Sequence, residues 1–109
     1  MAAACWASLL ACCRAASKPF YYAQFVDHFR ADTRVFNQRY YQDETYFKGP
    51  GSPIILIMGG EGGIPPEVGI YYPWVQEVLA KEFGALVLEL EHRFYGASLP
   101  FGDPASFER

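Results

Sequence analysis

A glycine-rich loop carries the clearest chemical signal in the sequence. The run Gly59-Gly60-Glu61-Gly62-Gly63 directly follows an apolar segment over residues 53–58. A loop of this kind at the carboxyl end of a buried strand can aim backbone N–H groups into a ligand crevice. Those N–H groups suit either a phosphate or the oxyanion of an acyl-transfer reaction. A third interpretation is a tight turn in which the glycines serve backbone freedom alone.

Of the two ligands, the oxyanion fits the loop better. The phosphate-binding pattern G-x-G-x-x-G fails at Pro65, the pattern G-x-x-x-x-G-K-[ST] is absent, and Glu61 would place a negative charge beside a bound anion. In α/β-hydrolases, by contrast, one oxyanion donor comes from the loop after the third strand, where esterases carry a glycine-rich run.

A second group of ionisable residues, Glu91-His92-Arg93, closes another apolar run over residues 85–90. A Glu-His pair suggests acid-base chemistry, but adjacent residues of a strand point to opposite faces and cannot both address one reacting atom. We therefore favour a structural role, in which Glu91 and Arg93 pair with each other or with neighbouring loops. His28, which lies in an aromatic segment, is likewise interpreted as a hydrogen-bonded packing residue rather than a base.

The sequence contains no complete catalytic triad. The nearest match to the nucleophile motif G-x-S-x-G is Gly96-Ala97-Ser98-Leu99-Pro100, which ends in a proline that cannot make the same turn and donates no N–H. Neither histidine, His28 or His92, lies near a suitable serine and aspartate in the sequence. No catalytic residue is therefore assigned in this chain.

The elements that would position these residues can be read from the hydrophobic pattern. Aromatic and β-branched residues over 20–29 and 35–42, separated by a polar break, predict an antiparallel pair of strands. The uninterrupted apolar runs 53–58 and 85–90 predict parallel strands covered on both faces. With a helix between them they form a βαβ unit, so the predicted fold class is α/β.

The predicted helix lies between Pro73, which suits a first helical position, and Gly84, which suits the residue just past the end. Its apolar residues fall on one helical stripe, which we expect to face the sheet: Trp74, Val75, Val78, Leu79 and Phe83. A last motif, Asp103-Pro104, resembles the start of another helix.

Length and composition restrict the classes of protein. The chain has 109 residues, which limits it to one domain, whereas enzymes built on large α/β sheets need roughly 200 or more. Its hydrophobic content of 51% and aromatic content of 17% exclude a disordered chain. A net charge of −3 without a basic run makes nucleic acid an unfavoured partner.

The N-terminal residues 1–17 differ in character from residues 18–109. They hold every cysteine of the chain (Cys5, Cys12 and Cys13), so the remaining residues contain neither a disulfide framework nor a cysteine-based metal site. This apolar stretch followed by small residues is similar to a secretory signal, although no basic residue precedes it. An arbitrary start and a palmitoylated Cys12-Cys13 anchor are the alternatives, and the stretch is too short to span a bilayer.

Five blocks of the sequence, in order, resemble the S28 family of serine peptidases, which includes Pro-Xaa carboxypeptidases, dipeptidyl peptidases and the thymus-specific branch. They are residues 24–29, 36–40, 53–62, 84–87 and 91–102. The last of these blocks is the most diagnostic. Glu89 departs from the family pattern, because an apolar or small residue is usual inside that strand, and a buried carboxylate needs a partner.

The resemblance implies an α/β-hydrolase sheet in which the third strand lies beside the fourth, and a Ser-Asp-His triad located beyond Arg109. It assigns backbone donation and substrate-edge contact to Gly59, Gly60 and Glu61, and scaffolding of the active-site floor to Glu91, His92, Arg93 and Tyr95. It also implies peptide substrates, no metal or organic cofactor, and a secreted, lysosomal or vacuolar location.

We therefore interpret residues 18–109 as the N-terminal portion of an α/β-hydrolase peptidase domain, inactive as this chain alone. Carboxypeptidase and dipeptidyl peptidase specificity, with cleavage after proline or a small residue, both stay open, and so does the oligomeric state. The alternative is a non-catalytic secreted or membrane-associated module that uses half a hydrolase sheet for interaction.

Overall fold

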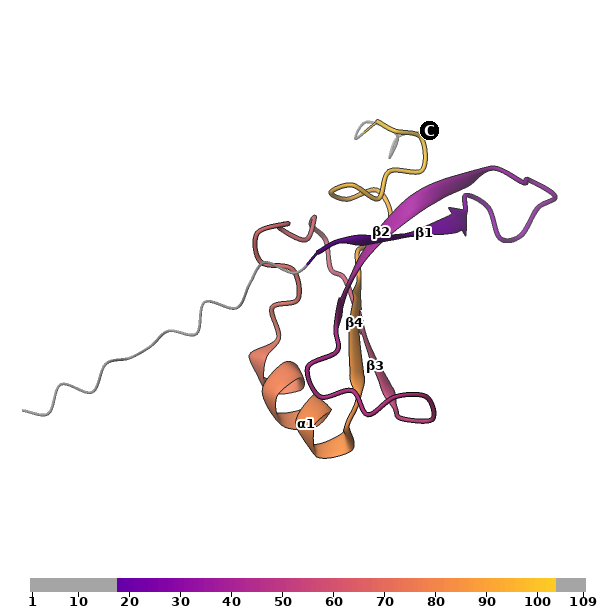
Figure 1. The fold of residues 1–109 in the computed structure, drawn as a ribbon. Coiled ribbons are helices and arrows are strands. Elements are labelled where there is room, and N and C mark those ends of the chain that lie inside the picture. The colour runs from indigo at the N-terminus through magenta and orange to yellow at the C-terminus, as the bar shows by residue number, and fades with distance from the viewer. Residues whose placement is uncertain (1–17, 104–109) are drawn as a thin grey trace, which may run out of the picture.

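Among the described residues, the strands form one mixed sheet of four in the order β1-β2-β4-β3 (Figure 1). The computed structural model describes residues 18–103, so the predictions for residues 1–17 and for a helix after Asp103 lie outside the described residues. The strands are β1 Phe20–Phe25, β2 Val35–Asp43, β3 Ile54–Met58 and β4 Leu86–Leu90.

Strand pairing follows the predicted pattern. β1 and β2 are antiparallel, and the register places Phe20 opposite Tyr40. β3 and β4 are parallel, with Leu56 opposite Leu88. Both the antiparallel pair and the parallel strands of the βαβ unit are therefore confirmed. The central contact between the two pairs is antiparallel, from β2 to β4.

A helical segment connects β3 to β4 and lies against one side of the sheet (Figure 1). It consists of a π-helical turn, η1 Val75–Leu79, followed by the short helix α1 Ala80–Phe83. Gly84 ends the helix in the left-handed conformation with a φ of 62°, which a residue with a side chain rarely adopts. The predicted stop at Gly84 is confirmed.

Only part of the expected apolar stripe of this helix faces the sheet. Trp74, Val78 and Phe83 are exposed, whereas Gln76 and Ala80 are buried. The physical reason is the π-helical turn, in which the N–H of Ala80 bonds to the carbonyl of Val75, five residues earlier. This extra residue per turn rotates the side chains away from the positions that a regular 3.6-residue period assigns to them.

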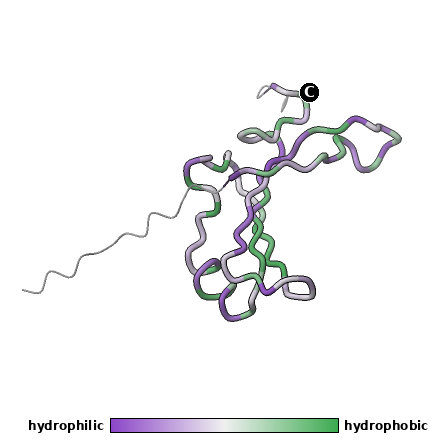
Figure 2. The backbone as a smooth tube through the Cα atoms, in the orientation of Figure 1, coloured by the Kyte–Doolittle hydropathy of each residue, from purple (hydrophilic) through white to green (hydrophobic). Residues whose placement is uncertain are grey.

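The two faces of the sheet differ in cover. The helix side holds the buried core, whose residues are Tyr41, Ile64, Ile70, Ala80, Ala85 and Val87. The opposite face carries an apolar groove of about 380 Å³, which is lined by residues that include Leu56 and Leu88. On this face β3 also exposes Ile54, Leu56 and Met58. Figure 2 shows this concentration of hydrophobic residues along β3 and β4. The expectation that both faces are covered is thus wrong for the described residues, because their single helical segment lies on one side.

Candidate functional site

The glycine-rich loop begins where β3 ends, and its first glycine is fixed against β4. The N–H of Gly59 donates to the carbonyl of Leu90 at 2.8 Å. A Cβ atom on Gly59 would lie only 2.7 Å from that same carbonyl oxygen. Glycine is therefore required here by the close approach of two backbones, and the N–H of Gly59 is already engaged in the sheet.

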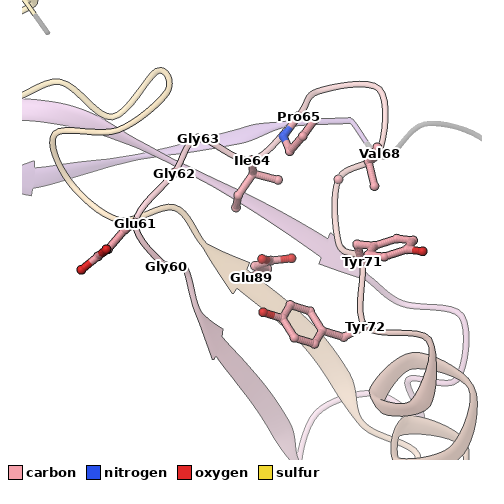
Figure 3. Close-up of a pocket in the computed structure, with 11 residues that line it drawn as sticks. Gly60, Glu61, Gly62, Gly63, Ile64, Pro65, Val68, Tyr71, Tyr72 and Glu89 are labelled. Carbon is pink, nitrogen blue, oxygen red and sulfur yellow. The ribbon is translucent and has the colours of Figure 1, made fainter.

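The next two residues keep their backbone donors available. Among residues 18–103 the N–H groups of Gly60 and Glu61 have no hydrogen-bond acceptor, although the carbonyl of Gly60 accepts from the N–H of Gly62 at 2.9 Å. Both residues line a pocket of about 440 Å³ between the loop and the segment that leads to the helix (Figure 3). This arrangement can receive a negatively charged or polarised oxygen from a ligand.

A buried carboxylate, that of Glu91, organises the floor beneath the loop. It is inaccessible to solvent and accepts hydrogen bonds from two backbone N–H groups, those of Ile64 at 2.8 Å and Ala97 at 3.0 Å. It also accepts from the Ser98 hydroxyl at 2.8 Å and from the Arg39 guanidinium at 2.5 Å. One side chain thus connects β2, the glycine-rich loop and the turn after β4.

Arg39 is the buried counter-ion of this carboxylate. Burial acts to lower the pKa of the Arg39 guanidinium, but the hydrogen bond and charge of Glu91 outweigh it and raise the pKa. The guanidinium also donates to the carbonyl of Ile64 at 2.7 Å. Arg39 therefore carries its charge permanently. Together with Glu91 it fixes the residue that follows the glycine-rich loop, because Arg39 binds the carbonyl of Ile64 and Glu91 binds its N–H.

Two glycines make room for this ion pair. A Cβ atom on Gly96, whose φ is 53°, would lie 2.1 Å from a carboxylate oxygen of Glu91. A Cβ atom on Gly63 would lie 2.7 Å from the Cα of Gly96. The last glycine of the loop and the turn after β4 therefore touch at a point where no side chain fits, and this contact fixes the loop over the ion pair.

Ser98 is a structural residue in this arrangement. Its side chain is fully buried, its hydroxyl donates to Glu91, and the same oxygen accepts from the N–H of Arg39 at 2.9 Å. Within residues 18–103 neither His28 nor His92 forms a hydrogen bond with a serine. The described part of the chain thus assembles no Ser-His pair.

Arg93 and its neighbours connect the end of β4 to the end of β1. The Arg93 guanidinium donates to the carbonyls of Val26 at 2.9 Å and Phe25 at 3.2 Å, and it lies 3.3 Å from Nε2 of His28. His92 is exposed, contacts the Arg93 carbonyl through Nδ1 at 2.6 Å, and stacks edge-on against Tyr95.

The predicted pairing of Glu91 with neighbouring loops is confirmed, but Arg93 is not its partner. Arg93 instead interacts with β1, because Arg39 on the adjacent strand occupies the Glu91 carboxylate. His28 is exposed, but it forms a hydrogen-bond contact with Arg93 and packs edge-on against Phe25, as the prediction of a hydrogen-bonded packing residue requires. The oxyanion and scaffold roles assigned to these residues stay predictions.

Sequence reasoning gave no role to two charged residues that the structure places at the site, Arg39 and Glu89. Arg39 lies in a strand rich in aromatic residues. A basic residue in such a strand indicates that its charge has a buried partner, and this pattern could have identified Arg39. Glu89 interrupts an apolar strand and lines the same pocket as Gly60. Among the described residues no cluster of three or more His, Cys, Asp or Glu side chains could hold a metal ion.

The described residues also contain no helix that is long and apolar enough to cross a membrane.

Comparison with known proteins agrees with the resemblance drawn from the motifs. A family profile described as serine carboxypeptidase S28 matches residues 24–107. The chain is 44% identical over 80 residues to the human thymus-specific serine protease, a match that covers 72% of this chain and 15% of that protein. It is 40% identical over 87 residues to the human lysosomal Pro-X carboxypeptidase, covering 76% of this chain and 16% of the relative.

A plant relative gives a similar match. The probable serine protease EDA2 of Arabidopsis thaliana is 44% identical over 87 residues, which cover 79% of this chain and 17% of that protein. The chain thus spans about one sixth of the length of these curated relatives. The matched region includes the glycine-rich loop, Arg39 and Glu91, so the site described above lies within the shared segment. The chain belongs to the serine carboxypeptidase S28 family of serine peptidases.

Proposed function

We propose that this chain supplies the first strands of an α/β-hydrolase sheet and the oxyanion loop of a serine-type exopeptidase. In this proposal the Ser-Asp-His triad is not among these 109 residues, and the isolated chain has no peptidase activity. The glycine-rich loop contributes backbone donors, and the Glu91–Arg39 pair holds that loop in place. We propose a secreted, lysosomal or vacuolar location, and the name of the lysosomal relative supports the lysosomal alternative.

One observation carries the proposal: the N–H groups of Gly60 and Glu61 have no acceptor in the described part of the chain, and they lie beside a pocket at the carboxyl end of β3. Carbonyl addition by a nucleophile places a negative charge on oxygen, and preorganised N–H donors stabilise that charge in the transition state. Because the N–H of Gly59 bonds to Leu90, its role is to anchor the loop rather than to donate.

The strand order supports the same assignment. β3 lies beside β4 and carries no further strand on its other side among the described residues. A hydrolase sheet continues at that position with the strand that bears the nucleophile. The exposed Ile54, Leu56 and Met58 then become part of the interior once the remaining layers of such a domain are in place.

The proposed substrates are peptides with proline or a small residue before the scissile bond. This choice rests on family membership and on the printed name of the Pro-X carboxypeptidase relative. The described residues favour neither the carboxypeptidase nor the dipeptidyl peptidase alternative.

Peptide hydrolysis by the natural full-length protein tests the loop assignment. Gly60→Pro removes one backbone donor, and we expect kcat to fall by about 10² to 10³ while KM changes little. Gly60→Ala keeps the N–H and meets no atom within 4 Å, so its loss should be at least about tenfold smaller. Equal kcat values for the two variants, with both shown to be folded by circular dichroism, would contradict the assignment.

A further inference from the structure

A buried carboxylate that the proposed hydrolysis does not use, that of Glu89, lines the pocket beside the glycine-rich loop. Glu89 is 7% exposed, and it lies on the helix side of β4 between Tyr41 on β2 and Ile57 on β3. Figure 3 shows its carboxylate in the pocket, near the rings of Tyr71 and Tyr72. It is therefore both shielded from bulk water and open to a ligand in the pocket.

One oxygen of this carboxylate has no partner. Oε2 is buried and has no hydrogen bond among the described residues. Burial raises the pKa of Glu89, and the nearby backbone N–H of Tyr71 opposes this shift only in part. A buried acceptor without a donor costs folding free energy, so an apolar residue would serve the core better at this position.

The surroundings of Oε2 select the chemistry of a ligand. A carboxylate only accepts hydrogen bonds, so the missing group is a donor, and a positive charge on it would keep the carboxylate ionised. None of the described residues that line the pocket is basic. Its second acidic residue, Glu61, points away from Glu89 (Figure 3), so the two carboxylates do not form a shared metal site.

The walls of the pocket favour an organic cation over an inorganic one. Besides backbone of the glycine-rich loop, they consist of the rings of Tyr71 and Tyr72 and of apolar side chains such as Ile64 and Val68. Aromatic faces attract ammonium groups, while aliphatic walls accept a hydrocarbon body. The volume of about 440 Å³ is sufficient for a small molecule.

We propose that the pocket formed by Glu89, Tyr71, Tyr72 and the glycine-rich loop binds an organic ammonium group carried on an apolar body. The ammonium N–H groups donate to Oε2 of Glu89, and the hydrocarbon part packs against Ile64 and the tyrosine rings. Such an ammonium can belong to a free amine or to the amino terminus of a peptide. The proposal concerns binding alone and does not depend on the hydrolytic chemistry.

Isothermal titration of the natural full-length protein with benzylamine and with benzyl alcohol tests the charge requirement. The two probes share size and ring but differ in the ammonium group. We expect benzylamine to bind at least about tenfold more tightly, which is the scale of one charge-assisted hydrogen bond. Equal affinities for the two probes, or no heat from benzylamine at millimolar concentration, would overturn the proposal.

Two variants locate the effect. Glu89→Gln keeps the shape of the side chain but removes the charge, and should weaken benzylamine binding at least about tenfold. Glu67→Gln removes an exposed charge of the same connecting segment, and should change the affinity by less than about twofold because solvent screens that charge. Thermal unfolding verifies that both variants fold. Benzylamine binding that survives Glu89→Gln unchanged would refute the site.

A second pair of probes distinguishes the source of the ammonium. Phenylalanine amide has a free amino terminus, whereas N-acetylphenylalanine amide does not. Tighter binding of phenylalanine amide than of benzylamine assigns the pocket to peptide amino termini, and weaker binding assigns it to free amines. Binding of the acetylated compound as tight as that of the free one would contradict the requirement for an ammonium group.

Discussion

The Glu91 carboxylate and the Arg39 guanidinium form a buried ion pair, with 2.5 Å between Oε2 and Nη2, although 52 residues separate them in the chain. The side chains are 0% and 8% exposed. The remaining acceptor positions of Glu91 are filled by Ile64, Ala97 and Ser98. This pair therefore connects the sheet to both loops of the candidate site, so its loss should affect stability and loop position together.

Removing one member of the pair should be strongly destabilising. Glu91→Gln leaves the Arg39 charge buried without a counter-ion, and we expect a loss of about 3 to 5 kcal/mol in the free energy of unfolding. Urea unfolding of the natural full-length protein measures it. The exposed Glu82→Gln serves as control and should change the value by less than about 0.5 kcal/mol. A Glu91→Gln variant as stable as Glu82→Gln would contradict the structural role of the pair.

The contact between the glycine-rich loop and the turn after β4 gives a second prediction. Gly96→Ala should cost at least about 2 kcal/mol, because its Cβ collides with the Glu91 carboxylate and its φ is positive. Gly62→Ala is the matched control, since a Cβ there meets no atom within 4 Å. In thermal unfolding experiments, only Gly96→Ala should have a lower midpoint temperature than the wild type. Similar midpoints for the two variants would argue against the close contact.

The pH dependence of stability should reveal the buried Glu89. Its pKa in the folded state lies above the usual value of 4.5, so the folded state retains a proton that the unfolded chain has released. Stability then falls as the pH rises through this window. Glu89→Gln does not titrate and should be more stable than the wild type near neutral pH.

Urea unfolding of both proteins at several pH values checks this prediction. The advantage of Glu89→Gln should shrink as the pH is lowered below about 4.5, where the carboxyl is protonated in both states. A stability difference that is absent at neutral pH, or one that grows towards acidic pH, would contradict the raised pKa of Glu89.

Local features of the fold were predictable from the sequence, because short-range patterns determine them. The apolar runs 53–58 and 85–90 are too short for helices, and they form β3 and β4. The first run ends at Gly59, and the second begins after Gly84. Gly84 ended the helix as expected. The π-helical turn at Val75–Leu79 was not predictable, because the periodicity of Trp74 and Val78 fits a regular helix equally well.

The candidate site was predictable only in outline. The glycine-rich loop and Glu91 were identified from their residue types and from their positions after apolar runs. Their partners were not, since Arg39 reaches Glu91 through the β2–β4 pairing, a long-range contact that no local pattern encodes. The unpartnered Oε2 of Glu89 could not be predicted either, because the neighbours of Glu89 on β2 and β3 are distant in the sequence.

The uncovered face of the sheet predicts that the 109-residue polypeptide aggregates in isolation. Ile54, Leu56 and Met58 are exposed along β3, which is an edge strand among the described residues, and exposed apolar edges promote association. We expect aggregates in light scattering of the purified polypeptide. Leu56→Lys should raise the monomeric fraction, whereas Phe29→Lys, at an exposed position outside the sheet, should not. A cooperative, monomeric unfolding transition of the unmodified polypeptide would contradict this expectation.

The proposed function is that these residues supply the oxyanion loop of a serine peptidase but not its nucleophile. Reaction of the natural full-length protein with a fluorophosphonate probe, followed by mass-spectrometric mapping of the adduct, tests it most directly. We expect that no serine of residues 1–109 is modified, because the proposal places the nucleophile outside this segment. Ser98 in particular is buried, and its hydroxyl is hydrogen-bonded to Glu91 and to the N–H of Arg39. A stoichiometric adduct on Ser98, or on any other serine of this segment, would contradict it.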